Sequence, residues 1–255
     1  MYRIINKFYN VLCRVTKVSD THISFSCEGE DLIIDKLFGN QSTGYYIDIG
    51  AYKSIRGNNT FKFYLKGWKG VLIEPNPRFK FWANIIRRRD KILSLGIDPN
   101  LKKESTEKKM YIYNDYPSNN TISEESVKNN LELLGRKHDA ELKLKFVGVE
   151  FLISNTEIFN NEIDIMSIDV EGVEEGLIES IVNVNKITPK VICIEQIHSS
   201  CEQIMQTNIY RILLNNDYIL LAKTVLNAIY IQKQFLEASQ SDYLKILNDD
   251  YKKSL

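Results

Sequence analysis

Short apolar runs recur along the chain, and segments long enough to form helices separate them. Five such runs read GYYIDIG, GVLIEP, KILSLGID, IDIMSIDVEG and KVICIEQ, at residues 44–50, 70–75, 91–98, 163–172 and 190–196. Because these runs are nearly continuous in aliphatic residues, they predict parallel strands that are buried on both faces. The segments 55–67 and 78–89 lie between the first three runs and are predicted crossover helices.

Two further apolar runs near the C-terminus predict a different strand arrangement. YILLAKT (residues 218–224) and NAIYIQK (residues 227–233) are separated by only a few residues. Two strands this close must pair antiparallel, because a parallel return requires a long crossover. The preceding residues 201–218 carry apolar positions at helical spacing and predict one amphipathic helix. Together the runs predict an α/β fold whose mostly parallel sheet ends in an antiparallel hairpin.

Residues 99–162 do not lead directly into the fourth buried run, and we interpret them as an insertion between strands three and four. Within them, Ser123 as an N-cap and Gly135 as a C-terminal stop bound a predicted helix. The alternating run ELKLKFVGV, at residues 141–149, predicts a strand with one face in water. The insertion is expected to cap the acceptor side of a single domain that spans residues 1–255.

The two ends of the chain are predicted to add helices to this domain. Apolar positions in the N-terminal extension, residues 1–24, have helical spacing, so this segment is expected to pack on the domain or on a second subunit of a homodimer, with weak association with a membrane surface as the alternative. Residues 234–255 predict a charged C-terminal helix without a readable role. Charged residues interrupt the N-terminal apolar positions, which excludes a transmembrane segment there and disfavours a cleaved signal peptide.

Composition and cysteine usage narrow the class of protein. Lys plus Arg equals Asp plus Glu at 33 each, so the chain has no net attraction for nucleic acid. The four cysteines, at positions 13, 27, 193 and 201, form no C-x-x-C pair, which argues against a zinc site or a disulfide framework. Reduced cysteines and a cytoplasmic location fit this usage best, with Cys193 expected to be a buried thiol. The richness in Asn, Ile and Lys indicates a bacterial source.

The turn after the first run favours one class of nucleotide ligand. Dinucleotide sites use G-x-G-x-x-G to cradle a pyrophosphate, whereas here only Gly50 follows Asp48. S-adenosylmethionine carries no phosphate, and it needs a tight turn together with carboxylates for its ribose hydroxyls and its cationic end. Glu74 closes the second run, where such a carboxylate is expected. The pattern favours a methyltransferase, with an NAD-type enzyme and purely structural turn residues as alternatives.

A longer set of motifs resembles the FkbM family of S-adenosylmethionine-dependent methyltransferases. The similarity lies in SFSCEGEDLIIDKLFG, in GYYIDIGAYKSIRGNNTFKFYLKGWKGVLIEPNP and in IDIMSIDVEGVEEGLIESI, which begin at residues 24, 44 and 163. The resemblance implies a class I methyltransferase fold, which is Rossmann-like, with S-adenosyl-L-methionine as the cofactor. It also implies hydroxyls of sugars or natural products as acceptors. The sequence departs from the family's pattern at Cys27, Tyr52 and Asn58.

The resemblance further implies which residues line the site. The cofactor residues implied in this way are Glu30, Asp48, Gly50, Asn59, Thr60, Glu74 and, beside the adenine, Asp98. Tyr52, Glu171 and Asn120 are candidate contacts to the acceptor. Asp31 and Trp68 also fall on the motifs, but a helix cap and a core aromatic residue are the favoured interpretations.

The ends of the fourth and fifth runs carry candidate catalytic residues, because ligands of open α/β sheets bind beyond the carboxyl ends of the strands. Asp169 and Glu171 follow the fourth run, and Glu195 and His198 follow the fifth. His198 titrates near neutral pH and is the candidate base for a hydroxyl acceptor, with Asp169 or Glu195 orienting it. A surface histidine without a catalytic role is the alternative. The same oxygen-rich group would suit a divalent metal, but no compact metal motif supports one and no metal site is predicted.

These observations predict an S-adenosylmethionine-dependent O-methyltransferase. Its expected acceptor is a sugar hydroxyl, either in a nucleotide-activated sugar or in a precursor of a surface or capsular polysaccharide. One alternative keeps the cofactor and replaces the acceptor by a phosphate-type oxygen or a small metabolite. Alternatives of another class are an NAD-type oxidoreductase and a non-catalytic nucleotide-binding module.

Overall fold

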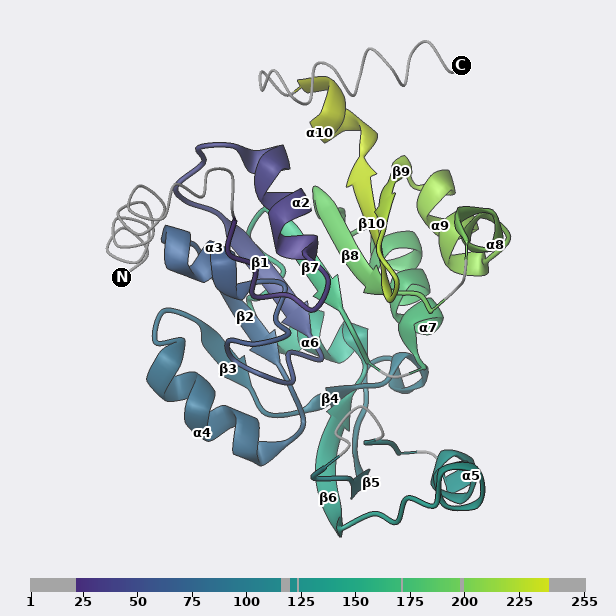
Figure 1. Ribbon diagram of the computed structural model, residues 1–255. Helices are drawn as coiled ribbons and strands as arrows, with labels where there is room; N and C mark the ends of the chain where they lie inside the picture. The colour runs from purple at the N-terminus through teal and green to yellow at the C-terminus, as the bar shows by residue number, and fades with distance from the viewer. Residues whose placement is uncertain (1–21, 116–119, 123, 171, 198–199, 239–255) are drawn as a thin grey trace, which may run out of the picture.

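The computed structural model describes residues 22–115, 120–122, 124–170, 172–197 and 200–238 (Figure 1). The predicted N-terminal helix up to residue 21 and the predicted C-terminal helix beyond residue 238 lie outside the described residues. Within these ranges, no helix is both long enough and apolar enough to cross a membrane.

A seven-stranded sheet forms the centre of the molecule. In spatial order its strands are β3 (Lys91–Leu93), β2 (Lys69–Ile73), β1 (Tyr45–Ile49), β7 (Ile165–Ile168), β8 (Val191–Glu195), β10 (Asn227–Gln232) and β9 (Tyr218–Lys223). The first five strands are parallel, and β10 pairs antiparallel with both β8 and β9. This order confirms the predicted mostly parallel sheet and its terminal hairpin.

Helices cover both faces of the sheet, so the strands are buried on both sides as their sequences predict. One face carries α2 (Glu30–Phe38), α3 (Phe61–Lys66), α4 (Pro77–Ile86) and α10 (Lys233–Ala238). The other face carries α6 (Val149–Asn155), α7 (Glu174–Ile178) with its π-helical continuation η3 (Glu179–Val184), α8 (Cys201–Met205) and α9 (Asn208–Asn215). Neighbouring residues of one strand therefore enter different cores: Tyr46 faces α3, and Ile47 faces the side of α7.

Two predictions about single side chains are confirmed in the core beneath α2 and α3: the buried ring of Trp68 and the buried thiol of Cys193. Trp68 is fully buried, and its ring packs edge-on against Phe38 and at a tilt against Phe63. Its indole N–H donates to the carbonyl of Gln41, so the ring is fixed immediately before β2. Cys193 lies in β8 as a buried free thiol.

The predicted third strand is divided between two sheets. β3 ends at Leu93, and Gly96–Ile97 form a separate strand, β4, which pairs with β6 in a second sheet. A Cβ atom on Gly96 would lie 2.2 Å from the ring of Phe146, so the chain can pass this close to β6 only because residue 96 has no side chain. Asp98 consequently follows β4 and does not end a strand of the central sheet.

Two predicted helices also differ from the structure. The expected crossover helix over residues 55–67 is helical only from Phe61 to Lys66, because Asn58 and Thr60 turn their side chains towards β1 instead. The single helix expected over residues 201–218 is two helices. Thr207 separates them: its hydroxyl donates to the carbonyl of Ile204 and its oxygen accepts from the N–H of Tyr210, which starts α9.

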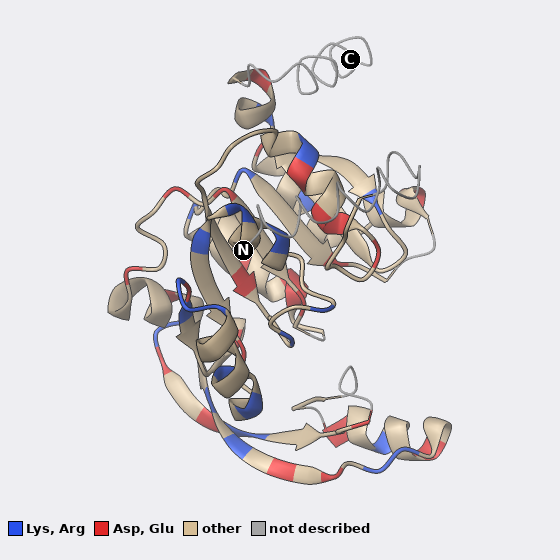
Figure 2. Ribbon diagram, turned by 60° about the vertical axis from the view of Figure 1, so that its left-hand side comes forward, with Lys and Arg blue, Asp and Glu red and all other residues tan. Residues whose placement is uncertain are grey.

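The insertion forms a second sheet in the order β4–β6–β5, with β5 (Ser105–Ile112) antiparallel to β6 (Ala140–Val147). Charged residues alternate along its two long strands, which project away from the central sheet together with α5 (Glu124–Leu134) (Figures 1 and 2). The insertion leaves the central sheet at the carboxyl end of β3. Its base packs on α7, since a Cβ atom on Gly176 would lie 2.7 Å from the ring of Pro99.

A buried guanidinium joins α4 to the central sheet. Arg87 follows the last residue of α4, has no exposed surface, and pairs with the equally buried carboxylate of Asp90 at 2.7 Å. The same guanidinium donates to the hydroxyls of Tyr46 and Thr60 and to the side-chain oxygen of Asn58. Because a buried charge must be fully hydrogen-bonded to be tolerated, this group fixes the loop before α3 against β1.

We expect Arg87→Met to lower the free energy of unfolding by about 3–5 kcal/mol, because it leaves the carboxylate of Asp90 buried without its cation. Arg88→Met, on the exposed side of the same turn, is the matched control and should change stability by less than about 0.5 kcal/mol. Urea denaturation followed by circular dichroism measures both. Equal losses in the two variants would contradict the structural role of Arg87.

Candidate active site

The turn after β1 is pressed against the end of β7. Gly50 has a φ of +82°, a conformation that residues with a side chain rarely adopt. A Cβ atom there would lie 1.6 Å from the carbonyl oxygen of Asp169. The N–H of Gly50 donates to the carbonyl of Ile73 at 2.9 Å, and the N–H of Asp169 donates to the carbonyl of Ile49. The single glycine of the D-x-G motif is therefore required by its packing between β2 and β7.

Asp48 faces inwards and organises the loop before α3. Its side chain is almost fully buried, and Oδ2 accepts hydrogen bonds from the Thr60 hydroxyl at 2.8 Å and from the Asn58 amide at 2.9 Å. Burial raises the pKa of Asp48, and the hydrogen bond from Thr60 and the charge of Arg87 oppose this shift. Both partners of Asp48 are protein side chains, so Asp48 and Thr60 fix the loop before α3 against β1.

Asn59 lies at the same edge and reaches across β7. Its amide donates to the hydroxyl of Ser167 at 3.1 Å and lies 3.5 Å from the thiol of Cys193. Ser167 and Cys193 were not expected at the site. They alternate with core residues inside continuous apolar strands, so no local pattern distinguishes them.

Glu74 closes β2, as expected, and holds the far side of the same turn. Its carboxylate accepts from the N–H of Tyr52 at 3.1 Å and from the N–H of Asn76 at 2.8 Å. Burial raises the pKa of Glu74 to about 7, and the nearby charges of Asp169 and Asp48 contribute to the increase. Tyr52 takes a positive φ of 37° and leaves its ring exposed beside the strand ends.

Two more acids stand at the ends of β7 and β8. Asp169 reaches solvent, but the surrounding protein, Glu174 and Asp48 together raise its pKa to about 6. Burial raises the pKa of Glu195 to about 7, with the charges of Asp169 and Glu174 adding to the shift. In the part of the chain that the structure describes, no cation lowers either pKa. This edge of the sheet is therefore strongly anionic when its carboxyls are ionised.

Glu174 accounts for the start of α7. Its carboxylate accepts from the N–H of Gly172 at 3.0 Å and from the N–H of Val170, so it occupies the first turn of the helix and satisfies free donors there. Glu171 and His198, which the sequence places at this edge, lie outside the described residues. Among the described residues, no group of three or more His, Cys, Asp or Glu side chains is arranged to hold a metal ion.

Glu30 is buried beside the carboxyl end of β8, where its partner Asn227 pairs with Glu195, and it connects distant parts of the chain. One carboxylate oxygen accepts from the Asn227 amide at 2.7 Å and from the Thr224 hydroxyl at 3.0 Å, and the other accepts from the N–H of Glu28. Burial alone would raise the pKa of Glu30, but these hydrogen bonds outweigh it and the pKa is lowered. Its carboxylate ties the start of α2 to the β9–β10 hairpin.

Asp98 and Asn120 are engaged within the insertion. Asp98 begins a short 3₁₀ helix, η1 (Pro99–Leu101), accepts from the N–H of Asn100 at 2.9 Å and pairs with Lys108 of β5. Burial opposes the shift, but the hydrogen bond from Lys108 holds the pKa of Asp98 below its usual value. The side-chain oxygen of Asn120 accepts from the N–H of Tyr113 at 2.7 Å. Both contacts stabilise the second sheet.

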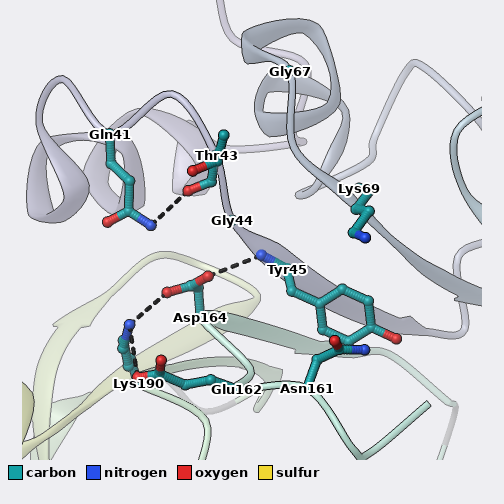
Figure 3. Close-up of a pocket in the computed structure, with 10 residues that line it drawn as sticks. All are labelled: Gln41, Thr43, Gly44, Tyr45, Gly67, Lys69, Asn161, Glu162, Asp164 and Lys190. Carbon is teal, nitrogen blue, oxygen red and sulfur yellow. Dashed lines mark hydrogen bonds and ion pairs between the residues drawn. The ribbon is translucent and has the colours of Figure 1, made fainter. Parts of the chain in front are cut away.

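A pocket of about 400 Å³ lies at the opposite edge of the central sheet (Figure 3). Tyr45, Lys69, Asp164 and Lys190 line it, and each stands at the amino end of a strand. Lys190 pairs with Asp164 at 2.7 Å and with Glu162 at 3.0 Å, and Asp164 also accepts from the N–H of Tyr45. This pocket is therefore remote from the acids at the carboxyl ends, and its charges largely neutralise one another.

Comparisons with known proteins identify the family. A family model described as a methyltransferase FkbM domain matches residues 48–220. This range begins within β1, includes β2, β3, β7 and β8, and ends within β9. No curated protein matches the sequence significantly.

Solved structures with a similar fold are distant in sequence. A TehB-like SAM-dependent methyltransferase from Corynebacterium glutamicum is 9% identical, with 89% of this chain and 97% of that chain covered and a TM-score of 0.40. The fibrillarin pre-rRNA processing protein of Methanococcus jannaschii is 11% identical, with coverages of 76% and 68% and a TM-score of 0.39. Monomeric WbdD is 11% identical, with coverages of 82% and 42% and a TM-score of 0.42. At these values the solved structures carry no inference about what this chain binds.

We expect Gly50→Ala to lower the free energy of unfolding by about 3 kcal/mol, because the added Cβ meets the Asp169 carbonyl and the backbone is strained. Gly135→Ala is the matched control: Gly135 has a φ of +64° but no atom within 4 Å of its added Cβ. It should lose only about 1 kcal/mol, from the backbone conformation alone. Urea denaturation distinguishes the two, and similar losses would contradict the tight contact between β1 and β7.

Proposed function

The chain belongs to the FkbM family of S-adenosylmethionine-dependent methyltransferases, and from this premise we propose that it methylates a sugar hydroxyl. The acceptor we propose is a nucleotide-activated sugar or a precursor of a surface polysaccharide. The reaction takes place at the carboxyl ends of β1, β2, β7 and β8. Family membership makes the protein an enzyme that uses S-adenosylmethionine; the acceptor and the residue roles below are our proposal.

The anionic strand ends are the observation that carries this proposal. Three carboxyls there have pKa values raised to between about 6 and about 7, namely those of Glu74, Asp169 and Glu195. Burial is the main cause of these increases and the neighbouring acids add to them, so a cationic ligand stabilises the ionised carboxyls by offsetting both effects. S-adenosylmethionine carries a sulfonium and an ammonium group, so its charge suits this edge.

The residues proposed to hold the cofactor surround the turn after β1. Gly50 allows the tight turn that brings β1 against β7, and Glu74 is the candidate acceptor of hydrogen bonds from the ribose hydroxyls. Asn59 lies beside them at the end of β7. Asp48 and Thr60 act indirectly, since their hydrogen bonds to each other fix the loop that carries Asn59. Glu30 and Asp98 are also tied to protein groups, so we assign them a supporting role.

The candidate catalytic groups belong to the neighbouring strands β7 and β8. The cofactor supplies a methyl group activated by its positive sulfur. A neutral sugar hydroxyl is a weak nucleophile, so a base that accepts its proton accelerates transfer by about 10²–10⁴-fold. We propose His198 as this base, with Asp169 or Glu195 orienting its ring. Both carboxyls titrate close to neutral pH, which suits groups that stabilise a histidine during proton transfer.

The acceptor is proposed to enter beneath the insertion. The insertion leaves the central sheet at the carboxyl end of β3, beside the strand ends, and its base packs on α7. Tyr52 exposes its ring at this edge, and Glu171 and Asn120 are the other candidate contacts. A neutral hydroxyl is compatible with the surrounding carboxylates. A phosphate-type oxygen in the reacting position would be repelled by them, which disfavours the alternative acceptor, and the diphosphate of a nucleotide-activated sugar has to bind away from these carboxylates.

We expect the affinity for S-adenosylmethionine to rise as the pH increases from about 5.5 to about 8, because Glu74, Asp169 and Glu195 lose their protons through this range. S-adenosylhomocysteine lacks the sulfonium charge and should gain less. The ratio of the two affinities should increase by about tenfold, which corresponds to about one pKa unit of coupling. Isothermal titration calorimetry at several pH values measures the ratio.

The control for this titration is Glu74→Gln, which keeps the size of the side chain, removes one titrating charge and retains only one of the two oxygens that accept from Tyr52 and Asn76. The variant should bind S-adenosylmethionine at least about tenfold more weakly at pH 8, since a charged hydrogen bond is lost, and its pH dependence should be flatter. A constant affinity ratio across the pH range would contradict the proposed cationic ligand at the strand ends.

We expect the protein to consume S-adenosylmethionine with at least one member of a panel of sugar nucleotides. His198→Ala should lower kcat by about 10²–10⁴-fold while leaving cofactor affinity nearly unchanged. His22→Ala is the matched control and should retain full turnover. It alters an exposed histidine that precedes α2 and β1 in the chain. Mass spectrometry of the products identifies the methylated hydroxyl.

Two results would contradict these assignments separately. Turnover only with acceptors that lack a sugar would reject the proposed substrate class and leave the methyltransferase activity intact. Full turnover by His198→Ala would reject the base, and Glu195→Gln would then be the next variant to test by its pH–rate profile.

A further inference from the structure

The outer side of α4 exposes large apolar side chains. Phe81 is 62% exposed, Trp82 is 60% exposed and Ile85 is 47% exposed. The two aromatic rings pack edge to face, with centroids 5.3 Å apart. Phe81 and Ile85 are one helical turn apart, so the three side chains form one continuous stripe. On the opposite side of the helix, Phe79 and Ala83 are buried against the sheet and hold α4 in place.

Positive charge surrounds this apolar stripe. The exposed cations on α4 and in the residues that follow it are Arg78, Lys80, Arg88, Arg89 and Lys91. None of them forms an ion pair with an acid in the described part of the chain; Arg78 donates to Asn114 and Arg89 donates to the carbonyl of Tyr64. Asp90 is the one acidic residue from 75 to 97, and Arg87 neutralises it in the interior.

The position of α4 leaves this surface accessible. The helix packs beside β3, the edge strand of the central sheet, and lies at the periphery of the molecule (Figures 1 and 2). It starts at Pro77, shortly after Glu74 at the end of β2. A surface bound to this side of α4 would therefore lie near the candidate site without covering the central strand ends.

We propose that the outer face of α4 docks on membrane surfaces that contain anionic phospholipid. Phe81, Trp82 and Ile85 enter the boundary between headgroups and acyl chains, and the five exposed cations bind lipid phosphates. Tryptophan and phenylalanine beside lysine and arginine are the side chains that favour this boundary. The net charge of the whole chain is zero, so the attraction is local and orients the molecule on the surface.

Charge complementarity favours lipid over the other possible occupants. A second copy of the same face would bring five further cations against the first five, and like charges in contact are repelled. Single-stranded nucleic acid would satisfy the cations and stack on Phe81 and Trp82, but it would leave the aliphatic side chain of Ile85 without an apolar partner. An anionic bilayer supplies both the phosphates and the apolar layer. This inference is independent of the acceptor proposed above.

The chain contains two tryptophans, which makes the test direct. Trp68 is fully buried, whereas Trp82 is largely exposed, so Trp82 dominates any change in fluorescence on docking. The full chain is titrated with vesicles of phosphatidylglycerol and phosphatidylcholine in equal parts, and with vesicles of phosphatidylcholine alone. We expect a blue shift and reduced acrylamide quenching with the anionic vesicles only. Raising the salt from about 0.05 M to about 0.5 M should weaken the effect by screening.

Variants locate the contact. Phe81→Ser combined with Ile85→Ser retains Trp82 and should weaken vesicle binding by at least about tenfold, since two apolar side chains are lost from the interface. Leu133→Ser, at a leucine of α5 that is 78% exposed, is the apolar control and should bind as the parent does. Lys80→Gln with Arg88→Gln should weaken binding by about tenfold or more. Lys103→Gln with Lys137→Gln removes two exposed cations elsewhere and should not.

Several outcomes would overturn the proposal. One is the absence of both a blue shift and vesicle co-sedimentation with anionic lipid. Equal binding to neutral vesicles would remove the role of the cations, and equal binding by the α4 variants and their controls would place the contact elsewhere. A blue shift that depends on protein concentration without lipid would indicate a second copy on this face, and one produced by RNA would indicate nucleic acid.

Discussion

The buried pairing of Arg87 with Asp90 constrains the side of the molecule on which the site depends. A fully buried guanidinium requires partners for all its donors, because each unsatisfied charge in the interior is costly. Arg87 pairs with Asp90 in the turn that follows α4. It also donates to Tyr46 of β1 and to Asn58 and Thr60 in the loop before α3. The side chains of Thr60 and Asn58 in turn both donate hydrogen bonds to the carboxylate of Asp48. One cation at the end of α4 therefore determines the shape of the loop beside the strand ends.

Ionisation of the acids at those strand ends lowers the free energy of unfolding of the protein. The raised pKa values of Glu74, Asp169 and Glu195 mean that the folded chain holds these protons more tightly than the unfolded chain does. Their contribution to stability is therefore present at low pH and is lost as the pH rises through about 6 to 7. A site that keeps like charges together at neutral pH is typical of one that is completed by a ligand of opposite charge.

The molecule divides into a rigid interior and a variable outer surface. The central sheet is covered on both faces, and its helices are joined to it by buried apolar side chains. In contrast, α5 has no buried residue and carries exposed leucines on the projecting insertion. The outer face of α4 is apolar and basic. Both helices therefore expose apolar side chains at the periphery of the described structure.

Local sequence patterns determined the central features of the protein. Continuous apolar runs specify strands buried on both faces, two runs a few residues apart specify a hairpin, and the turn at Gly50 followed by Glu74 specifies the motif of the site. These features could be predicted because each depends on residues close together in the chain. The helix break at Thr207 also depends on residues close together in the chain, because Thr207 caps α9. The helical spacing of the apolar residues continues on both sides of Thr207, so the pattern predicted one helix where the structure has two.

Only the tertiary structure decided which acids are enclosed by protein groups and which reach solvent. Asp48 and Asp169 both belong to apolar strand motifs, yet one is enclosed by Thr60 and Asn58 and the other reaches solvent. Glu30 accepts a hydrogen bond from Asn227, which is 197 residues away in the chain. Gly96 belongs to the second sheet because it has no side chain that would collide with the ring of Phe146. Such partners are remote in the chain, and spacing carries no information about them. Hydrogen-bond satisfaction and close packing act between neighbours in space, and they fixed these side chains once the sheet had formed.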